Sequence, residues 1–118
     1  MERINAHEPK IYLIPEELGG IEVKRIKDEI SKEIDELKPN YIIFDLRNTS
    51  FIDSSGIGFL LGRYTQVKKY NGKVVLYGVS KSIAKLLKLS GMYSIMQIVE
   101  KEEEEVLWIN LKSNFLQC

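Results

Sequence analysis

The stretch YIIFDLRNTSFIDSSGIGFLLGRYTQVKKYNGKVVLYGV, residues 41–79, decides the fold. Its two ends are short apolar runs, 41–46 and 73–79, which are rich in β-branched and aromatic residues and predict buried strands. Between them, apolar residues recur at helical spacing from about Gly56 to Tyr70. A strand, a helix and a second strand in this order predict parallel pairing through a right-handed crossover.

The flanking sequence extends the same pattern. A helix with one apolar face is predicted over 23–37, where Pro39 ends it. Another is predicted over about 81–90, with Gly91 as the residue after its end. We therefore expect an α/β layered fold, in which a central, mixed but mostly parallel sheet of about four strands is combined with about four helices.

The remaining elements are weaker in the sequence. The segments 10–14 and 96–99 are short apolar pieces that predict an earlier and a later strand. The run KEEEEVLWINL, residues 101–111, begins with glutamates, which suit the first turn of a final helix because carboxylates are favoured at the positive end of its dipole. We find no internal repeat and no linker, so residues 1–118 are expected to form a single domain.

Composition excludes several classes of function. Seventeen Lys and Arg residues balance 17 Asp and Glu residues, so the basic excess that nucleic-acid or membrane-surface binding requires is missing. No apolar run approaches the roughly 20 residues of a membrane span. The single cysteine, Cys118, has no partner for an intramolecular disulfide or a zinc site, so we expect a cytoplasmic chain without metal or cofactor.

The segment with chemical information is FIDSSGIGFLLGRY, residues 51–64, which follows the first central strand and leads into a helix. Asp53, Ser54 and Ser55 are residue types that cap helix N-termini, and capping is the simplest interpretation of them. However, three such residues in succession, followed by glycine, exceed what one cap needs. A serine at this position could carry a phosphate without unfolding the helix, because helix N-termini favour anions.

Phosphorylation there would alter binding more than folding. A phosphoserine adds about −1.5 to −2 charges and three acceptor oxygens, here close to the carboxylate of Asp53. A docked partner would meet a hydrated dianion in place of a neutral hydroxyl, and displacing that hydration costs energy. Because about 1.4 kcal/mol changes affinity tenfold, such a modification is sufficient to switch binding off.

FIDSSGIGFLLGRY, together with YIIFDLRNTS before it, NGKVVLYGVS after it and LLKLSGMYSI further on, closely resembles the anti-sigma factor antagonists of the STAS domain family, in particular those of the sporulation type. The resemblance covers roughly residues 40–100. It implies a STAS-like fold and a non-enzymatic protein whose unphosphorylated form binds an anti-sigma factor with serine kinase activity, so freeing a sigma factor. It also implies that the kinase phosphorylates Ser55, that a serine phosphatase reverses this, and that Asp53 assists recognition by the kinase.

The same resemblance implies a partner-binding surface around the motif, formed by Ser54, Gly56, Ile57 and Gly58. The first third of the chain departs from the family pattern. Where members have a G-E-[LIV]-D turn in the partner surface, this chain reads IPEELGGIEV, and Glu17 is our candidate contact there.

Phe59 and Arg63 are four residues apart, on a helical face away from the apolar stripe of Ile57, Leu60 and Tyr64. We expect them to be partly exposed beside Ser55, where an aromatic and an arginine would serve as interface anchors. The alternative, that Phe59 packs on an adjoining helix or loop, is equally open.

Other chemistry is less well supported. Gly56, Gly58 and Gly62 resemble a dinucleotide-binding loop, but the next strand ends without the acidic residue such a site uses. A simpler role for Gly58 and Gly62, which share one helical face, is to let a sheet, a helix or a partner approach closely. A serine hydrolase would need a base, and the only histidine, His7, is near the terminus. The main alternative to the switch is a STAS-type scaffold or transporter-accessory subunit in which the serine only caps a helix.

Asp45 lies inside the first central strand. We expect its carboxylate to bond to the backbone near the strand end, or to point off the sheet, without a role in function.

Overall fold

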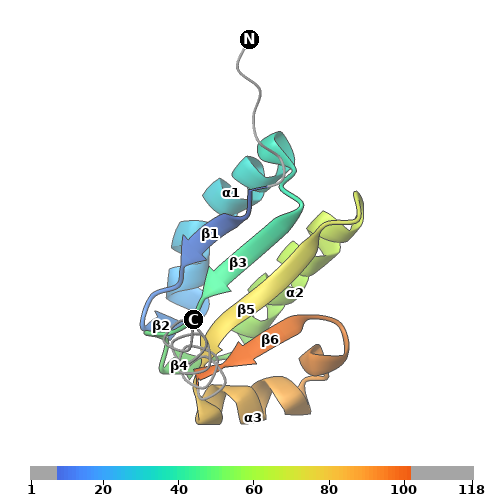
Figure 1. Cartoon of the computed structure of the whole chain (residues 1–118). Helices are drawn as coiled ribbons and strands as arrows, with labels where there is room; N and C mark the ends of the chain where they lie inside the picture. The colour runs from blue at the N-terminus through green and yellow to red at the C-terminus, as the bar shows by residue number, and fades with distance from the viewer. Residues whose placement is uncertain (1–7, 102–118) are drawn as a thin grey trace, which may run out of the picture.

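A computed structural model describes residues 8–101, in which the four predicted strands form one sheet (Figure 1). The strands are β1 (Lys10–Leu13), β3 (Tyr41–Asp45), β5 (Lys73–Val79) and β6 (Gln97–Glu100), in the order β1-β3-β5-β6. Every described pairing in this sheet is parallel, so the mixed sheet that we expected is wholly parallel among residues 8–101.

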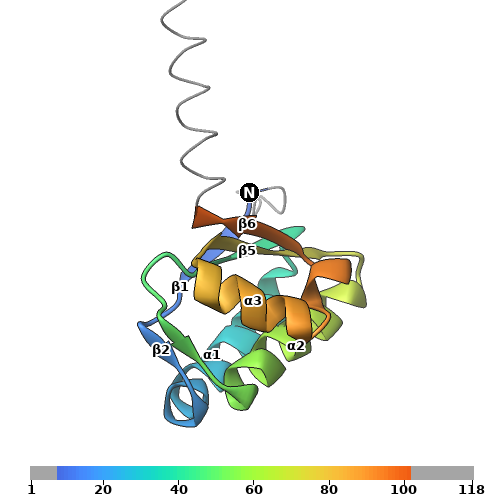
Figure 2. The same cartoon turned by 90° about the horizontal axis from the view of Figure 1, so that it is seen from below.

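Three α-helices lie against one face of this sheet: α1 (Gly20–Leu37), α2 (Ser54–Lys68) and α3 (Lys81–Leu89) (Figure 2). They confirm the three predicted helices, and Gly91 adopts the left-handed conformation after α3, ahead of a short 3-10 turn, η1 (Met92–Ser94). The core between the layers contains fully buried side chains from the three α-helices and from strands β3 and β5, among them Ile34, Phe44, Leu60, Leu76 and Leu87. The predicted final helix, apart from Lys101, lies outside the described residues.

The sequence analysis missed a second, very small sheet. It consists of β2 (Glu17–Leu18) and β4 (Phe51–Ile52), which pair in parallel, with Glu17 opposite Phe51 and Leu18 opposite Ile52. Two residues are too few to show a strand period, so no pattern could have revealed them. This small sheet places the beginning of α1 beside the beginning of α2 (Figure 1).

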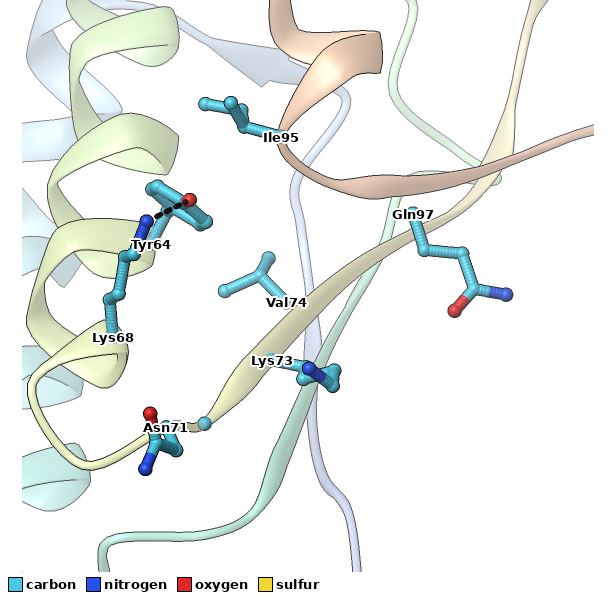
Figure 3. A pocket seen from close by; sticks show the side chains of 8 residues that line it. Tyr64, Lys68, Asn71, Lys73, Val74, Ile95 and Gln97 are labelled. Atoms are coloured by element: carbon cyan, nitrogen blue, oxygen red, sulfur yellow. Dashed lines mark hydrogen bonds between the residues drawn. The ribbon is translucent and has the colours of Figure 1, made fainter.

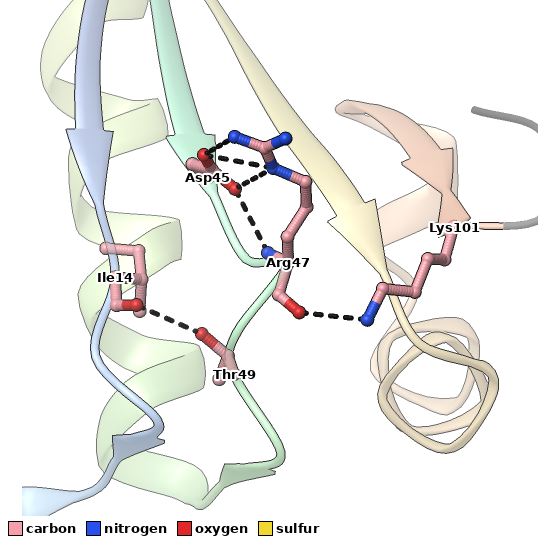
Figure 4. A network of polar contacts seen from close by, with 5 residues as sticks. All are labelled: Ile14, Asp45, Arg47, Thr49 and Lys101. Atoms are coloured by element: carbon pink, nitrogen blue, oxygen red, sulfur yellow. Dashed lines mark hydrogen bonds and ion pairs between the residues drawn. The ribbon is translucent and has the colours of Figure 1, made fainter. Parts of the chain in front are cut away.

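The connection from β3 to β4 is fixed by a network of polar contacts (Figure 4). The Asp45 carboxylate accepts hydrogen bonds from the backbone N–H of Arg47 at 3.1 Å and from its guanidinium Nη2 at 2.8 Å. Thr49 Oγ1 donates to the carbonyl of Pro15 at 2.9 Å, and Lys101 Nζ donates to that of Arg47 at 3.0 Å. The predicted bond of Asp45 to the backbone near its strand end is confirmed.

Phe59 and Arg63 are buried, with exposed fractions of 3% and 8%, so our expectation that they are partly exposed is wrong. The ring of Phe59 packs edge-on against Phe44, and the Arg63 guanidinium lies 5.2 Å from the Phe59 ring centre. The error has a simple cause: α2 packs against α1 as well as against β5, so its buried face is wider than one stripe. The alternative, that Phe59 packs on an adjoining helix or loop, is right that the ring is packed, but the aromatic partner shown lies in strand β3.

Gly56 is also buried, which contradicts its predicted role in partner contact. A Cβ atom at this position would overlap the carbonyl oxygen of Leu18 and come within 2.7 Å of Ile52 Cγ1, so the glycine permits the close contact between α2 and the small sheet. By contrast, a Cβ on Gly58 or Gly62 would meet no atom of residues 8–101 within 4 Å, apart from the adjoining residues and nearby backbone of its own helix. Within the described chain, neither glycine serves a close approach.

These two kinds of glycine allow a matched comparison. We expect Gly56→Ala to lower the free energy of unfolding by about 1 to 3 kcal/mol, because the start of α2 must move away from Leu18. Gly58→Ala is expected to raise it by about 0.5 to 1 kcal/mol, because alanine is the better helix former in open space. Urea denaturation followed by circular dichroism measures both, and equal effects would contradict the packing described above.

The second prediction concerns Arg63. Its Nε and Nη1 are buried and have no hydrogen-bond partner among residues 8–101, and burial lowers the pKa of the guanidinium by desolvation. We expect Arg63→Met, which keeps the apolar volume beside Phe59, to raise the free energy of unfolding by about 1 kcal/mol because the unsatisfied donors disappear. Arg63→Ala should instead lower it, because it leaves a cavity. A strongly destabilised Met variant in urea denaturation would contradict this account.

The third prediction is a pH dependence. The Arg47 side chain, and its backbone N–H, hold the pKa of Asp45 below its usual value by hydrogen bonding. A depressed carboxyl pKa stabilises the fold above the unfolded-state pKa of about 3.9, and that stability is lost as pH falls through the folded-state value. We expect Asp45→Asn to lower the melting temperature at pH 7 by a few degrees and to flatten its decline between pH 5 and 3. A decline as steep as that of the wild type would exclude Asp45 as a cause.

Candidate functional site

The motif DSSG forms the beginning of α2, and Ser55 is exposed there. Asp53 is the N-cap residue, and its Oδ1 accepts a hydrogen bond from the backbone N–H of Gly56 at 3.1 Å. Capping is therefore confirmed for Asp53. Ser54 and Ser55 occupy the first two helical positions, and neither hydroxyl bonds another described residue. The cap thus requires one of the three polar residues and leaves the two hydroxyl groups available.

The beginning of α1 reaches the same hydroxyl. A Cβ on Gly20 would lie 3.5 Å from Ser55 Oγ, and a Cβ on Gly19 would lie 2.9 Å from Asp53 Oδ2. The N–H of Gly19, the N-cap residue of α1, donates to Glu22 Oε1 at 2.9 Å. Two helix N-termini therefore meet beside Ser55, and the absence of a side chain at position 19 leaves room for the Asp53 carboxylate.

The predicted site residues divide into two groups. Besides Asp53, Ser54 and Ser55, the exposed or half-buried group contains Glu17, Ile57 and Gly58. The three that do not belong to the surface are Gly56, Phe59 and Arg63, as described above. Gly19 and Gly20 were not predicted to belong to the site, and their only signal in the sequence is the Gly-Gly pair at the start of an amphipathic helix.

The site is locally acidic although the whole chain is neutral. The two segments that build it, 14–22 and 49–58, contain four carboxylates and no Lys or Arg. Glu16 and Glu17 are exposed, and Glu22 and Asp53 are half-buried. The first basic residue along α1 is Lys24. An anion placed at Ser55 is thus favoured by two helix dipoles and opposed by neighbouring carboxylates.

The described residues contain no sign of a metal site, a membrane-spanning helix or a glycine-rich phosphate-binding loop. Residues 8–101 contain no cluster of three His, Cys, Asp or Glu side chains that could hold a metal ion. None of the described helices is both long enough and apolar enough to cross a membrane. The glycines 56, 58 and 62 all lie within α2, so they form helix rather than the phosphate-binding loop we considered.

A hollow of about 280 Å³ lies at the far end of α2 from Ser55 (Figure 3). Tyr64 and Lys68 from α2, Lys73 and Val74 from β5, and Ile95 are among the residues that line it. Lys68 Nζ donates a hydrogen bond to the Tyr64 hydroxyl at 3.2 Å. Since Ser55 and Lys68 occupy opposite ends of the helix, this hollow is separate from the motif.

Comparison of this sequence with known proteins is consistent with the exposed serine motif described above. The family model for the STAS domain matches residues 2–105. The chain is 31% identical over 77 residues to the anti-sigma F factor antagonist of Paenibacillus polymyxa. The aligned region covers 65% of this chain and 66% of that protein. The chain is also 32% identical over 87 residues to the anti-sigma F factor antagonist of Lysinibacillus sphaericus, and the aligned region covers 74% of each chain.

Solved structures show the same fold. The chain superimposes on the anti-sigma factor antagonist SpoIIAA in its unphosphorylated form with a TM-score of 0.66 and 25% identity, over 92% of this chain and 94% of that one. For the phosphorylated form of Bacillus SpoIIAA, the TM-score is 0.65 and the identity 29%, over 87% and 92% of the two chains. A match over residues 2–105, with the fold and the exposed serine motif in agreement, assigns the chain to the STAS domain family.

Proposed function

We propose that this protein is an anti-sigma factor antagonist that is switched by phosphorylation of Ser55. Unphosphorylated, it binds an anti-sigma factor that has serine kinase activity and so releases a sigma factor. The observation that carries the proposal is the Ser55 hydroxyl, exposed in the first turn of α2 without a hydrogen bond to any described residue. The names of its relatives, and the existence of SpoIIAA in both phosphorylation states, support the same function.

The fold can accept a phosphate at Ser55. The hydroxyl makes no hydrogen bond to another described residue, so modification disrupts no polar contact of residues 8–101. The N-termini of α1 and α2 both lie beside Ser55, and each favours an anion by about 0.3 to 1 kcal/mol in exposed positions. Phosphorylation therefore leaves the fold intact and changes the surface.

The surface change is large because of the local charge. A dianion at Ser55 adds to the carboxylates of Asp53 and Glu22 in the same small region. A partner that docks directly over the hydroxyl must then displace a strongly hydrated group, at a cost of several kcal/mol. The phosphorylated form accordingly dissociates from the kinase and stays inactive until a serine phosphatase removes the phosphate.

The rest of the circuit follows from this assignment. ATP and Mg²⁺ belong to the kinase, and the antagonist itself acts by binding rather than by catalysis, without a metal or cofactor. We propose that residues 1–118 form one STAS domain that acts in the cytoplasm. Neither nucleic acid nor membrane is a partner, in keeping with a chain of zero formal net charge.

The fourth prediction tests this function directly. Wild-type protein incubated with ATP and the kinase-type anti-sigma factors of its own genome should acquire one phosphate, located at Ser55 by mass spectrometry. Ser55→Ala should abolish labelling and bind within about threefold of wild type, whereas Ser55→Asp should bind at least about tenfold more weakly. Ser54→Ala, the matched neighbour, should still be labelled.

The substitution Asp53→Asn separates the role of Asp53 in recognition by the kinase from its role as the N-cap of α2. Asparagine caps a helix about as well as aspartate, so stability should be retained while the loss of the charge slows labelling by the kinase. If no such kinase labels or binds the wild type, the switch is excluded and a scaffold or transporter-accessory role is favoured. Labelling at Ser54 instead of Ser55 would refute the assignment of the acceptor.

A further inference from the structure

Two apolar side chains near Ser55 have no role in the core. Among residues 8–101, the large hydrophobic side chains that remain exposed are Ile11, Leu13, Ile21, Tyr41, Phe51, Leu89 and Ile95. Ile21 and Phe51, with exposed fractions of 73% and 48%, belong to the two segments that build the site. Single exposed hydrophobic residues are common, but two that flank one candidate modification site indicate a contact surface.

Ile21 lies in the first turn of α1, immediately after Gly20, the residue that adjoins the Ser55 hydroxyl. The buried side of α1 is formed further along by Ile30 and Ile34, with Val23 and Ile26 partly buried against the core. Ile21 is outside this stripe. Its side chain therefore contributes little to folding and remains available to a partner.

Phe51 belongs to the second of the two segments that build the site. It lies in β4, paired in register with Glu17 of β2, and both side chains are exposed. The next pair along the same two strands, Leu18 and Ile52, is buried. The alternation places Phe51 and Glu17 on the outer side of the small sheet. Phe51 also precedes the N-cap residue Asp53 by only two positions.

The charge beside Phe51 is acidic, whereas the exposed cations Lys24 and Arg25 follow Ile21 one turn further along α1. Glu16 and Glu17 are exposed beside Phe51 in the small-sheet region, and segments 14–22 and 49–58 contain no cation. A matching protein surface would carry apolar depressions surrounded by Lys or Arg side chains. In interfaces, buried aromatic and aliphatic anchors supply most of the affinity, whereas exposed charges mainly raise the association rate.

We propose that Ile21 and Phe51 are the two apolar anchors by which the unphosphorylated protein docks on its kinase, and that Glu16 and Glu17 guide a basic rim of that partner into place. This inference rests on the proposed function and adds the residues that determine affinity and the chemistry of the partner's face. Ser55 lies among these contacts. A phosphate at Ser55 keeps its hydration shell between the two anchors and the partner. The apolar side chains then cannot reach their depressions in the partner, and binding is lost although the partner is basic.

The test measures association and dissociation rates by surface plasmon resonance with the kinase-type anti-sigma factor that binds the wild type. Ile21→Ser and Phe51→Thr should each weaken binding at least about tenfold, mainly through faster dissociation. Threonine keeps the strand preference of position 51. The control is Leu89→Ser, which removes a side chain that is 83% exposed on α3 and should bind within about twofold of wild type.

The charges are tested separately. Glu16→Gln combined with Glu17→Gln should slow association and reduce its dependence on salt, while dissociation changes little. Glu36→Gln, an exposed acid in the last turn of α1, is the matched control and should leave both rates unchanged. Urea denaturation of each variant confirms that it is folded.

The outcomes distinguish this inference from the function on which it rests. If the wild type binds no kinase-type anti-sigma factor, the proposed function fails and the anchors fail with it. If the wild type binds, and phosphorylation of Ser55 abolishes binding, but folded Ile21→Ser and Phe51→Thr bind like wild type, the function stands and the anchors are refuted. Equal losses in Leu89→Ser would also refute them, because the effect would not be local.

Discussion

The candidate site depends on the contact between the first turn of α2 and the backbone of β2. Gly56 can lie against the carbonyl of Leu18 because it has no side chain, and Gly19 leaves room for the Asp53 carboxylate at the start of α1. The result is that two helices begin at nearly the same point. Ser55 lies there because of this packing, and its hydroxyl makes no hydrogen bond to another described residue. The position of the hydroxyl is thus fixed by its neighbours.

The electrostatics of the site follow from the same arrangement. Converging helix N-termini supply partial positive charge, while Asp53 and Glu22 each accept a backbone N–H at one of those termini. Each carboxylate is thereby balanced by the helix that it caps, and the hydroxyl between them remains neutral. A chain with no net charge therefore contains a small region in which adding charge has a large local effect.

The parts of this structure that the sequence could predict are the segments long enough to show a helical or strand pattern. The strands at 41–46 and 73–79 and the three helices are regular enough to recognise, and the DSSG motif locates Ser55 on its helix. The two-residue strands β2 and β4 depend on pairing between distant segments, which no local pattern contains. Phe59 and Arg63 were misplaced because a helix between a sheet and another helix buries two sides. Both errors concern tertiary neighbours, whereas the local preferences were interpreted correctly.

Two adjacent residues of α2 explain why the proposed phosphorylation of Ser55 would act on binding rather than on folding. Gly56 is buried against the small sheet and holds the helix start in place, whereas Ser55 faces outward and bonds to no described residue. A modification at Ser55 therefore changes the energy of the surface but not that of the core. If the hydroxyl made a structural hydrogen bond, phosphorylation would break that bond and would also lower the free energy of unfolding. Because it makes none, the added charge breaks no hydrogen bond of the described residues, and its main effect is on the surface that a partner would cover.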